Sequence, residues 1–260
     1  MGKIIGESFD GYVNQQIEAR QGVQGSGVSG KRTNSQLMAL NSRTSWIKFA
    51  SGVSISAERL KSLNLPTSLA GMGLAKANIL FNGTSQLTGT QNTLALTPQP
   101  SAANFSGYNY SKTWGTVPMP GIESMEVKCL NRGSLEKATI KVKAYSREQF
   151  DIIDVLYLRL GYTVLLEWGN SVYTPNLGGG SANVGGTLLE DNKRFFANSS
   201  KDNYRTILGP IGYYRNKYDA NYDGLLGKIS NFNWSFNADG SYDITITVVS
   251  LGDVIESLKV

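Results

Sequence analysis

Few residues of this chain have the types and spacing that catalysis requires. Asp151 and Asp154 lie three residues apart, a spacing that brings two carboxylates to one face of a helix for acid–base work. The chain has no histidine and a single cysteine, Cys129, so the usual general base and the usual zinc ligand sets are missing. We therefore interpret the two aspartates as a solvated helix stripe. The chain is predicted not to be an enzyme and to hold neither cofactor nor metal.

Two loops begin like ligand-binding motifs without completing them. The glycine-rich run at 178–186 lacks the Gly-Lys-Ser/Thr ending of a phosphate-binding loop. Residues 219–224, Asp-Ala-Asn-Tyr-Asp-Gly, resemble the start of a calcium loop but lack its alternating ligands and closing glutamate. We interpret the first as a flexible loop and the second as a turn.

The pattern of residues 134–169 predicts a strand, a capped helix and a second strand. Apolar and polar side chains alternate from Ala138 to Tyr145, as in a half-buried strand. Ser146 and Gln149 form a capping box, so we expect a helix from about Arg147, ended near Gly161. The following segment is apolar on both faces, as in an interior strand. The side chains predicted to lie in the core are Phe150, Ile153, Leu156, Trp168 and Trp234.

Two hairpins flank this unit. Residues 121–130 read as a strand that turns into the opening strand, and 232–248 read as a second hairpin around Asn237–Gly240. The 29 glycines and 17% charged residues favour strands and long loops over a helical bundle. The predicted fold class is mainly β (α+β): an antiparallel β-barrel over residues 121–260 with one packed α-helix and an insertion at about 170–224.

The first 36 residues predict an arm and a linker. Phe9, Val13 and Ile17 recur every four residues, which gives an amphipathic helix after a Ser8 cap. Residues 21–36 are rich in glycine and serine and form a flexible linker by composition. The arm therefore need not fold back on its own domain and can reach a neighbouring subunit.

Residues 37–120 are expected to form an N-terminal subdomain with a long polar loop. A short strand is predicted near Trp46, followed by one or two helical turns. From about residue 81 the chain is polar for some forty residues, and loops of that length usually bind or wrap. We interpret Tyr108 and Trp114 in this loop as interface anchors.

Several segments resemble baseplate hub proteins of contractile-tailed bacteriophages. These are residues 117–122, 131–139, 146–154, 158–169 and 239–244. The resemblance covers 117–169 and 225–258 well. It implies a tail-tube-like β-barrel with a helix beside the sheet, rings of subunits around the tail channel, and no catalytic residues. Family hubs commonly carry two barrels and form trimers, whereas one clear barrel is predicted here, so a hexameric ring stays open beside a trimer.

The expected function is that of a structural virion protein. It would form a ring-shaped hub or tube-adaptor that joins the tail tube to the spike or baseplate, assembled in the host cytoplasm and located in the virion tail. Its expected partners are other copies of itself and the tail-tube, spike and baseplate proteins, with DNA met only in passage through the channel. Lys141, Lys143 and Glu167 are the predicted interface or channel residues of the barrel.

Two other classes of function stay open. Tyr- and Trp-rich loops on a β scaffold, with Tyr108 and Trp114, would suit a carbohydrate-binding module. The net charge of +5 would suit a protein that contacts nucleic acid, although lysines and arginines are mostly scattered. No stretch approaches the roughly 20 apolar residues of a membrane span, so no membrane-spanning segment is expected.

Overall fold

The computed structural model describes the greater part of the chain after residue 44. The described residues are 45–63, 65–83, 108–111, 115–118, 120–130, 135–170, 172–173, 182–184, 188–189, 195–196 and 205–250.

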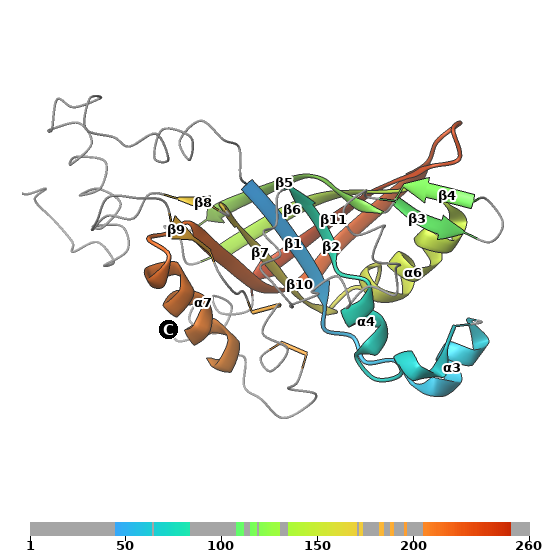
Figure 1. The fold of residues 1–260 in the computed structure, drawn as a ribbon, viewed down its shortest axis with the longest axis horizontal. Coiled ribbons are helices and arrows are strands. Elements are labelled where there is room, and N and C mark those ends of the chain that lie inside the picture. The colour runs from blue at the N-terminus through green and yellow to red at the C-terminus, as the bar shows by residue number, and fades with distance from the viewer. Residues whose placement is uncertain are drawn as a thin grey trace, which may run out of the picture.

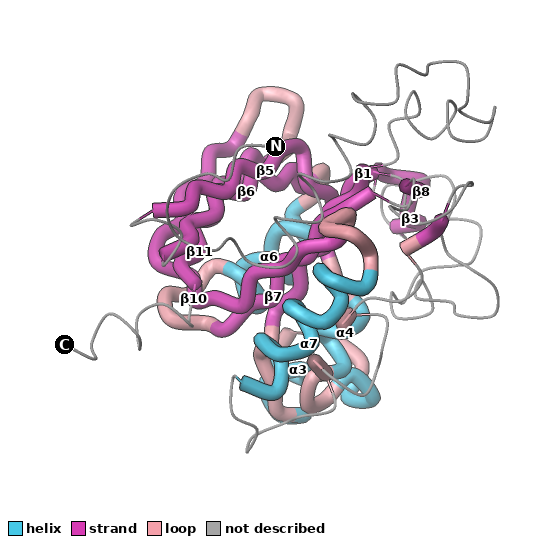
Figure 2. Tube along the Cα trace, turned by 90° about the vertical axis from the view of Figure 1, so that its left-hand side faces the viewer, coloured by secondary structure: helices cyan, strands magenta, loops and turns pink. Residues whose placement is uncertain are grey.

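One curved antiparallel sheet of seven strands dominates the fold (Figure 1). The strand order is β2-β1-β7-β10-β11-β6-β5. The sheet curls until its edge strands β2 and β5 approach each other, and the strands surround a common interior (Figure 2). The predicted mainly β class is confirmed. The strands are β1 (Ser45–Ser51), β2 (Leu80–Gly83), β5 (Gly121–Leu130), β6 (Leu135–Ala144), β7 (Thr163–Asn170), β10 (Tyr222–Phe236) and β11 (Tyr242–Ser250).

The sheet reaches further back in the sequence than the expected barrel of residues 121–260. β1 pairs with β7 along its whole length and with β2 on its other side. Phe49 of β1 is fully buried opposite Leu166 of β7. Residues placed in a separate N-terminal subdomain therefore supply two strands of the same sheet, because β7 needs an apolar neighbour on both sides.

Both predicted hairpins are present. β5 pairs with β6, and β10 pairs with β11 around a turn in which Gly240 adopts a φ of +83°. Along β11 every second side chain is buried, starting from Tyr242, as the alternation in sequence predicts. The register of β10 shifts between Ile229 and Asn231, which marks a bulge.

The predicted helix is α6 (Arg147–Tyr157), and it lies across one end of the barrel. The Ser146 hydroxyl accepts a hydrogen bond from the Gln149 N–H at 3.3 Å, and the Gln149 side chain accepts one from the Tyr145 N–H at 2.8 Å. These bonds satisfy backbone donors that a helix start leaves without partners. Past the helix, Gly161 adopts a φ of +80°, the conformation for which glycine was expected there.

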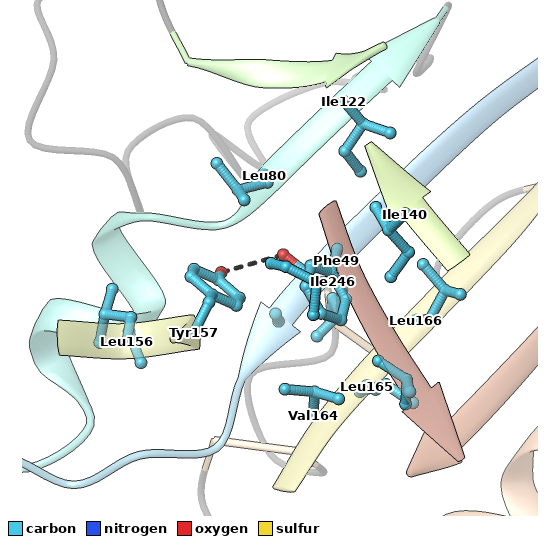
Figure 3. Close-up of a cluster of buried hydrophobic side chains, with 14 of the residues drawn as sticks. Phe49, Leu80, Ile122, Ile140, Leu156, Tyr157, Val164, Leu165, Leu166 and Ile246 are labelled. Atoms are coloured by element: carbon cyan, nitrogen blue, oxygen red, sulfur yellow. Dashed lines mark hydrogen bonds between the residues drawn. The ribbon is translucent and has the colours of Figure 1, made fainter. Parts of the chain in front are cut away.

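α6 is fastened to β1 by polar contacts inside an apolar core (Figure 3). The buried Tyr157 hydroxyl donates to the backbone oxygens of Phe49 and Asn78, at 3.1 and 2.8 Å. The Ser51 hydroxyl donates to the Leu156 oxygen at 2.7 Å. Each bond satisfies a polar group that burial would otherwise leave without a partner. Together the bonds fix the position of α6 at the end of the barrel. The side chains around them include Leu80, Ile122, Ile140, Val164, Leu166 and Ile246.

The insertion between β7 and β10 contains a helix that the sequence did not predict, α7 (Arg205–Lys217). Its sequence includes the poor helix formers Gly209, Pro210 and Gly212, and for this reason the sequence did not indicate a helix. The smaller elements are α3 (Ala57–Ser62), η2 (Thr67–Leu69) and α4 (Gly73–Ala77), and the two-stranded sheets β3 (Tyr108–Ser111) with β4 (Gly115–Pro118) and β8 (Val172–Tyr173) with β9 (Ala182–Asn183). Among the residues described, none of the helices is long and apolar enough to cross a membrane.

Removal of the Tyr157 hydroxyl tests whether its hydrogen bonds hold α6 in place. We expect Tyr157→Phe to lower the free energy of unfolding by about 1–2 kcal/mol, because the one hydroxyl hydrogen that the Phe49 and Asn78 oxygens share is lost. Urea denaturation measures the change. The matched control is Tyr213→Phe on the exposed side of α7, for which a change within about 0.5 kcal/mol is expected. Equal effects of the two substitutions would contradict the role given to Tyr157.

Candidate functional site

The outer wall of the barrel has two different halves. Over β1, β7 and β10 the wall is apolar and covered by α7 and by described residues of the insertion. Ile211 of α7 lies 3.4 Å from where a side chain on Gly224 would begin, so the helix packs closely on β10 at this glycine. Over β11, β6 and β5 the wall is polar and open, with Lys141 opposite Thr245 on one side and Ser124 on the other.

Glu167 lies at the centre of the covered half. Its side chain is fully buried, and its two carboxylate oxygens accept hydrogen bonds from the consecutive Leu188 and Leu189 N–H groups at 2.8 and 3.2 Å. The Tyr222 hydroxyl of β10 donates to the same carboxylate. Lys48 of β1 is opposite Glu167 in the strand register, on the same face of the sheet. The carboxylate thus holds the insertion on the sheet.

Burial controls the protonation of this group. Loss of solvation raises the pKa of the Glu167 carboxyl, while the Tyr222 hydroxyl, the Lys48 charge and the two backbone N–H groups limit the rise. Burial and the neighbouring carboxylate also raise the pKa of Tyr222, which keeps its hydroxyl a donor. Glu167 was predicted to face a partner or a channel. In the structure its carboxylate meets groups of its own chain.

The other two predicted barrel residues lie on the open half of the wall. Lys141 is exposed. Lys143 is partly buried, 3.7 Å from Asp243 of β11, and its ammonium lies 6.0 Å from the centre of the Tyr145 ring. A partly solvated pair at this distance contributes little to stability, so the Lys143–Asp243 contact does not fix the fold.

A cluster of aromatic side chains lies where the β10–β11 hairpin extends beyond the barrel, and we call it the aromatic end. It consists of Phe150, Trp234, Phe236 and Tyr242. Phe150 stacks on Tyr242 with ring centres 4.4 Å apart and meets Trp234 edge-on at 5.0 Å. Trp234 is 49% exposed and Phe236 is 61% exposed. Large apolar side chains left open together mark interaction surfaces in soluble proteins.

The exposure of Trp234 corrects the expectation that it is a core residue. Its position in the alternation is right, since it points to the same face as Ile244 across the hairpin. However, β7 pairs with β10 only as far as Lys228, whereas β6 pairs with β11 as far as Tyr242. Around Trp234, β10 therefore lacks a described strand on its β7 side, and α6 covers Trp234 only in part. The length of β10 relative to β7 was the signal in the sequence that could have shown this.

The remaining predicted interface residues have no described side chains. Tyr108 begins β3, where its backbone pairs with Pro118. The other four, Phe9, Val13, Ile17 and Trp114, lie outside the described residues. Their interface roles stay predictions.

Replacement of the buried carboxylate tests its place in the covered half. We expect Glu167→Gln to lower the free energy of unfolding at neutral pH by about 1–3 kcal/mol, because an amide cannot accept from every donor around it and Lys48 loses a nearby negative charge. Denaturant unfolding measures the loss. The control is Glu126→Gln on the exposed wall, whose effect should stay within about 0.5 kcal/mol.

The difference in unfolding free energy between wild type and Glu167→Gln should depend on pH, because the pKa of Glu167 is raised. Between the ordinary glutamate range near pH 4.3 and the higher folded-state pKa, the folded protein binds more protons than the unfolded chain. The contribution of this group is therefore greatest in acid and falls as the pH rises through that window. Wild type should exceed Glu167→Gln by more at pH 4 than at pH 8, and an advantage that grows with pH would contradict the raised pKa.

Comparison with known proteins gives no relative for this chain. It matches no family model, no curated protein and no solved structure.

Proposed function

We propose that this chain is a structural subunit of a contractile phage tail, part of a ring that joins the tail tube to the spike or baseplate. The resemblance to baseplate hub proteins implies a β-barrel with a helix beside the sheet, and the curved antiparallel sheet with α6 packed on it supports the proposal. The same resemblance implies a ring of such barrels around a channel. On this proposal the protein works by assembly.

The observation that carries the proposal is the free edge of β10. The Ile229 backbone on that edge still pairs with Gly161 and Tyr162, at 2.8 and 3.0 Å. Beyond Ile229 none of the described strands pairs with the edge, although β11 continues to pair with the other edge as far as Phe236. The Phe232 N–H is satisfied by its neighbour, the Asn231 side chain, at 2.9 Å. An open strand edge is a template for a strand from another chain. Here it runs beside the exposed Trp234 and Phe236.

The polar half of the wall has a place in the same proposal. Lys141 and Lys143 both lie on β6, away from the insertion, on a face that also carries Thr139, Thr245 and Thr247. Among the described residues of β6 and β11 none is an exposed large apolar side chain, although Tyr145, directly after β6, is one. Such a face suits the water-filled channel of a ring, through which DNA passes without a specific site. The same face would equally suit the polar rim of a contact between subunits.

Electron microscopy tests the proposal directly. Negative-stain images of the purified chain at high concentration should show closed rings with a countable rotational symmetry, and the protein should be found in purified tail particles. A protein that stays monomeric at high concentration and is absent from such particles would contradict the proposal.

The aromatic end also favours a second candidate, a carbohydrate-binding module. Trp234 and Phe236 are two residues apart on one face of a rigid hairpin, an arrangement that can stack on a sugar ring. If glycan binding by the purified protein is lost in Trp234→Ala and kept in a Trp114 substitution, this candidate replaces the ring subunit. Strongly salt-dependent DNA binding would instead favour the nucleic-acid class.

A further inference from the structure

The aromatic end leaves an apolar surface without a cover in the described part of the chain. Phe236 packs on Tyr242 with ring centres 5.0 Å apart, yet 61% of Phe236 stays exposed. Arg147 lies over the Phe150 ring at 5.5 Å and is paired with Asp151 at 2.8 Å. The surface is therefore aromatic at its centre, with its one adjoining guanidinium already paired.

The chain itself carries a segment of matching chemistry. Residues 8–20 are predicted to form an amphipathic helix whose apolar stripe is Phe9, Val13 and Ile17, with Tyr12 beside it. Such a stripe must be covered by another apolar surface. Residues 8–20 contain Asp10, Glu18 and Arg20, a net charge of 1 − 2 = −1. Their charges do not oppose docking beside Arg147, but the apolar contact decides it.

Residues 21–44 tether the arm to the start of β1. The distance from that point to the aromatic end disfavours docking within one chain. Ser45, the first residue of β1, pairs with Asn170, next to the Gly169 that pairs with Tyr222. Tyr222 begins β10 and Phe236 ends it, and 14 steps along a strand span about 45 Å. Between residues 20 and 45 lie 24 residues, which as a flexible coil have an average span of about 27 Å. Docking on the same copy would require this segment to extend well beyond its average span, which costs conformational entropy, although its fully extended reach of about 80 Å allows it. The arm starts at one end of the barrel and its matching surface lies at the other.

We propose that the amphipathic arm of one copy docks on the aromatic end of a neighbouring copy. A neighbour placed end to end brings its Trp234 and Phe236 close to the tether, whereas the arm's own copy presents them a barrel length away. The contact is heterologous, so repetition produces a closed ring or a continuous stack. The inference deepens the proposed function, on which it rests only in requiring that copies of the chain meet.

Two full-length variants test the docking by complementation. The arm variant, Val13→Asp with Ile17→Asp, keeps the aromatic end. The surface variant, Trp234→Ser with Phe236→Ser, keeps the arm. Because each retains one half of the contact, each alone should associate at least tenfold more weakly than wild type, while a mixture of the two should form pairs that contain one copy of each. Analytical ultracentrifugation with a fluorescent label on the arm variant measures the pairs.

Matched controls separate docking from folding and from charge. Asn14→Asp with Gln15→Asp adds the same charge to the polar side of the arm and should leave association unchanged. Urea unfolding should show that the surface variant keeps a wild-type transition, and Phe236→Ser alone, at the more exposed position, replaces the double variant if it does not. Since the contact is mainly apolar, raising the salt from 0.05 to about 0.5 M should change the pairing less than threefold.

The outcomes distinguish this inference from the proposed function. Mixed pairs that neither variant forms alone would support the inference. Variants that stay monomeric when mixed, as docking within one chain requires, would overturn it. Closed rings formed by both variants without mixed pairs would also overturn it and leave the proposed function standing. Mixed pairs without rings in wild type would support the inference and count against the proposed function.

Discussion

The structure depends on the burial of β7 on both of its faces. Its residues from Val164 to Glu167 are completely buried, which a strand in the wall of a small barrel achieves only with a cover on each side. The inner face packs with β1 and α6, and the outer face lies under the insertion and α7. The two covers flank β7 in the chain, α6 directly before it and the insertion directly after it.

Two ionisable side chains, Glu167 and Lys48, are buried under the outer cover, and the hydrogen bonds of Glu167 attach that cover to the sheet. A buried carboxylate is costly unless donors surround it, and Glu167 obtains two from the insertion and one from β10. Displacement of the insertion would break these hydrogen bonds, and any displacement that kept the carboxylate buried would leave it without donors. The Arg215 guanidinium of α7, which donates to Asp223 of β10 at 2.9 Å from its Nε, ties the same segment to the sheet a second time. One half of the wall is thus covered, and the exposed surfaces described above are the other half and the aromatic end.

Local sequence signals predicted the elements of the barrel well. The capping box placed α6, and the two alternating hairpins became β5–β6 and β10–β11, because these features depend on neighbours in the chain. Long-range features were not predictable in the same way. The pairing of β1 with β7 joins residues more than a hundred positions apart. The helix α7 contains the poor helix formers Gly209, Pro210 and Gly212, so tertiary packing rather than local sequence holds it in place. For the same reason, Glu167, expected at an interface or channel, is buried, and Trp234, expected in the core, is exposed. Alternation indicates the face to which a side chain points, and only the assembled fold shows whether that face is covered.

The central claim is that the barrel is a building block whose contacts are made by the projecting β10–β11 hairpin. Hydrogen exchange of the backbone amides over a series of protein concentrations tests this claim most directly. The account predicts that residues 230–236, on the free edge of β10, become protected as the concentration rises, while the amides of α7 and of the α6 core exchange at unchanged rates. Protection that is independent of concentration at the hairpin, or that increases only over α7, would contradict it.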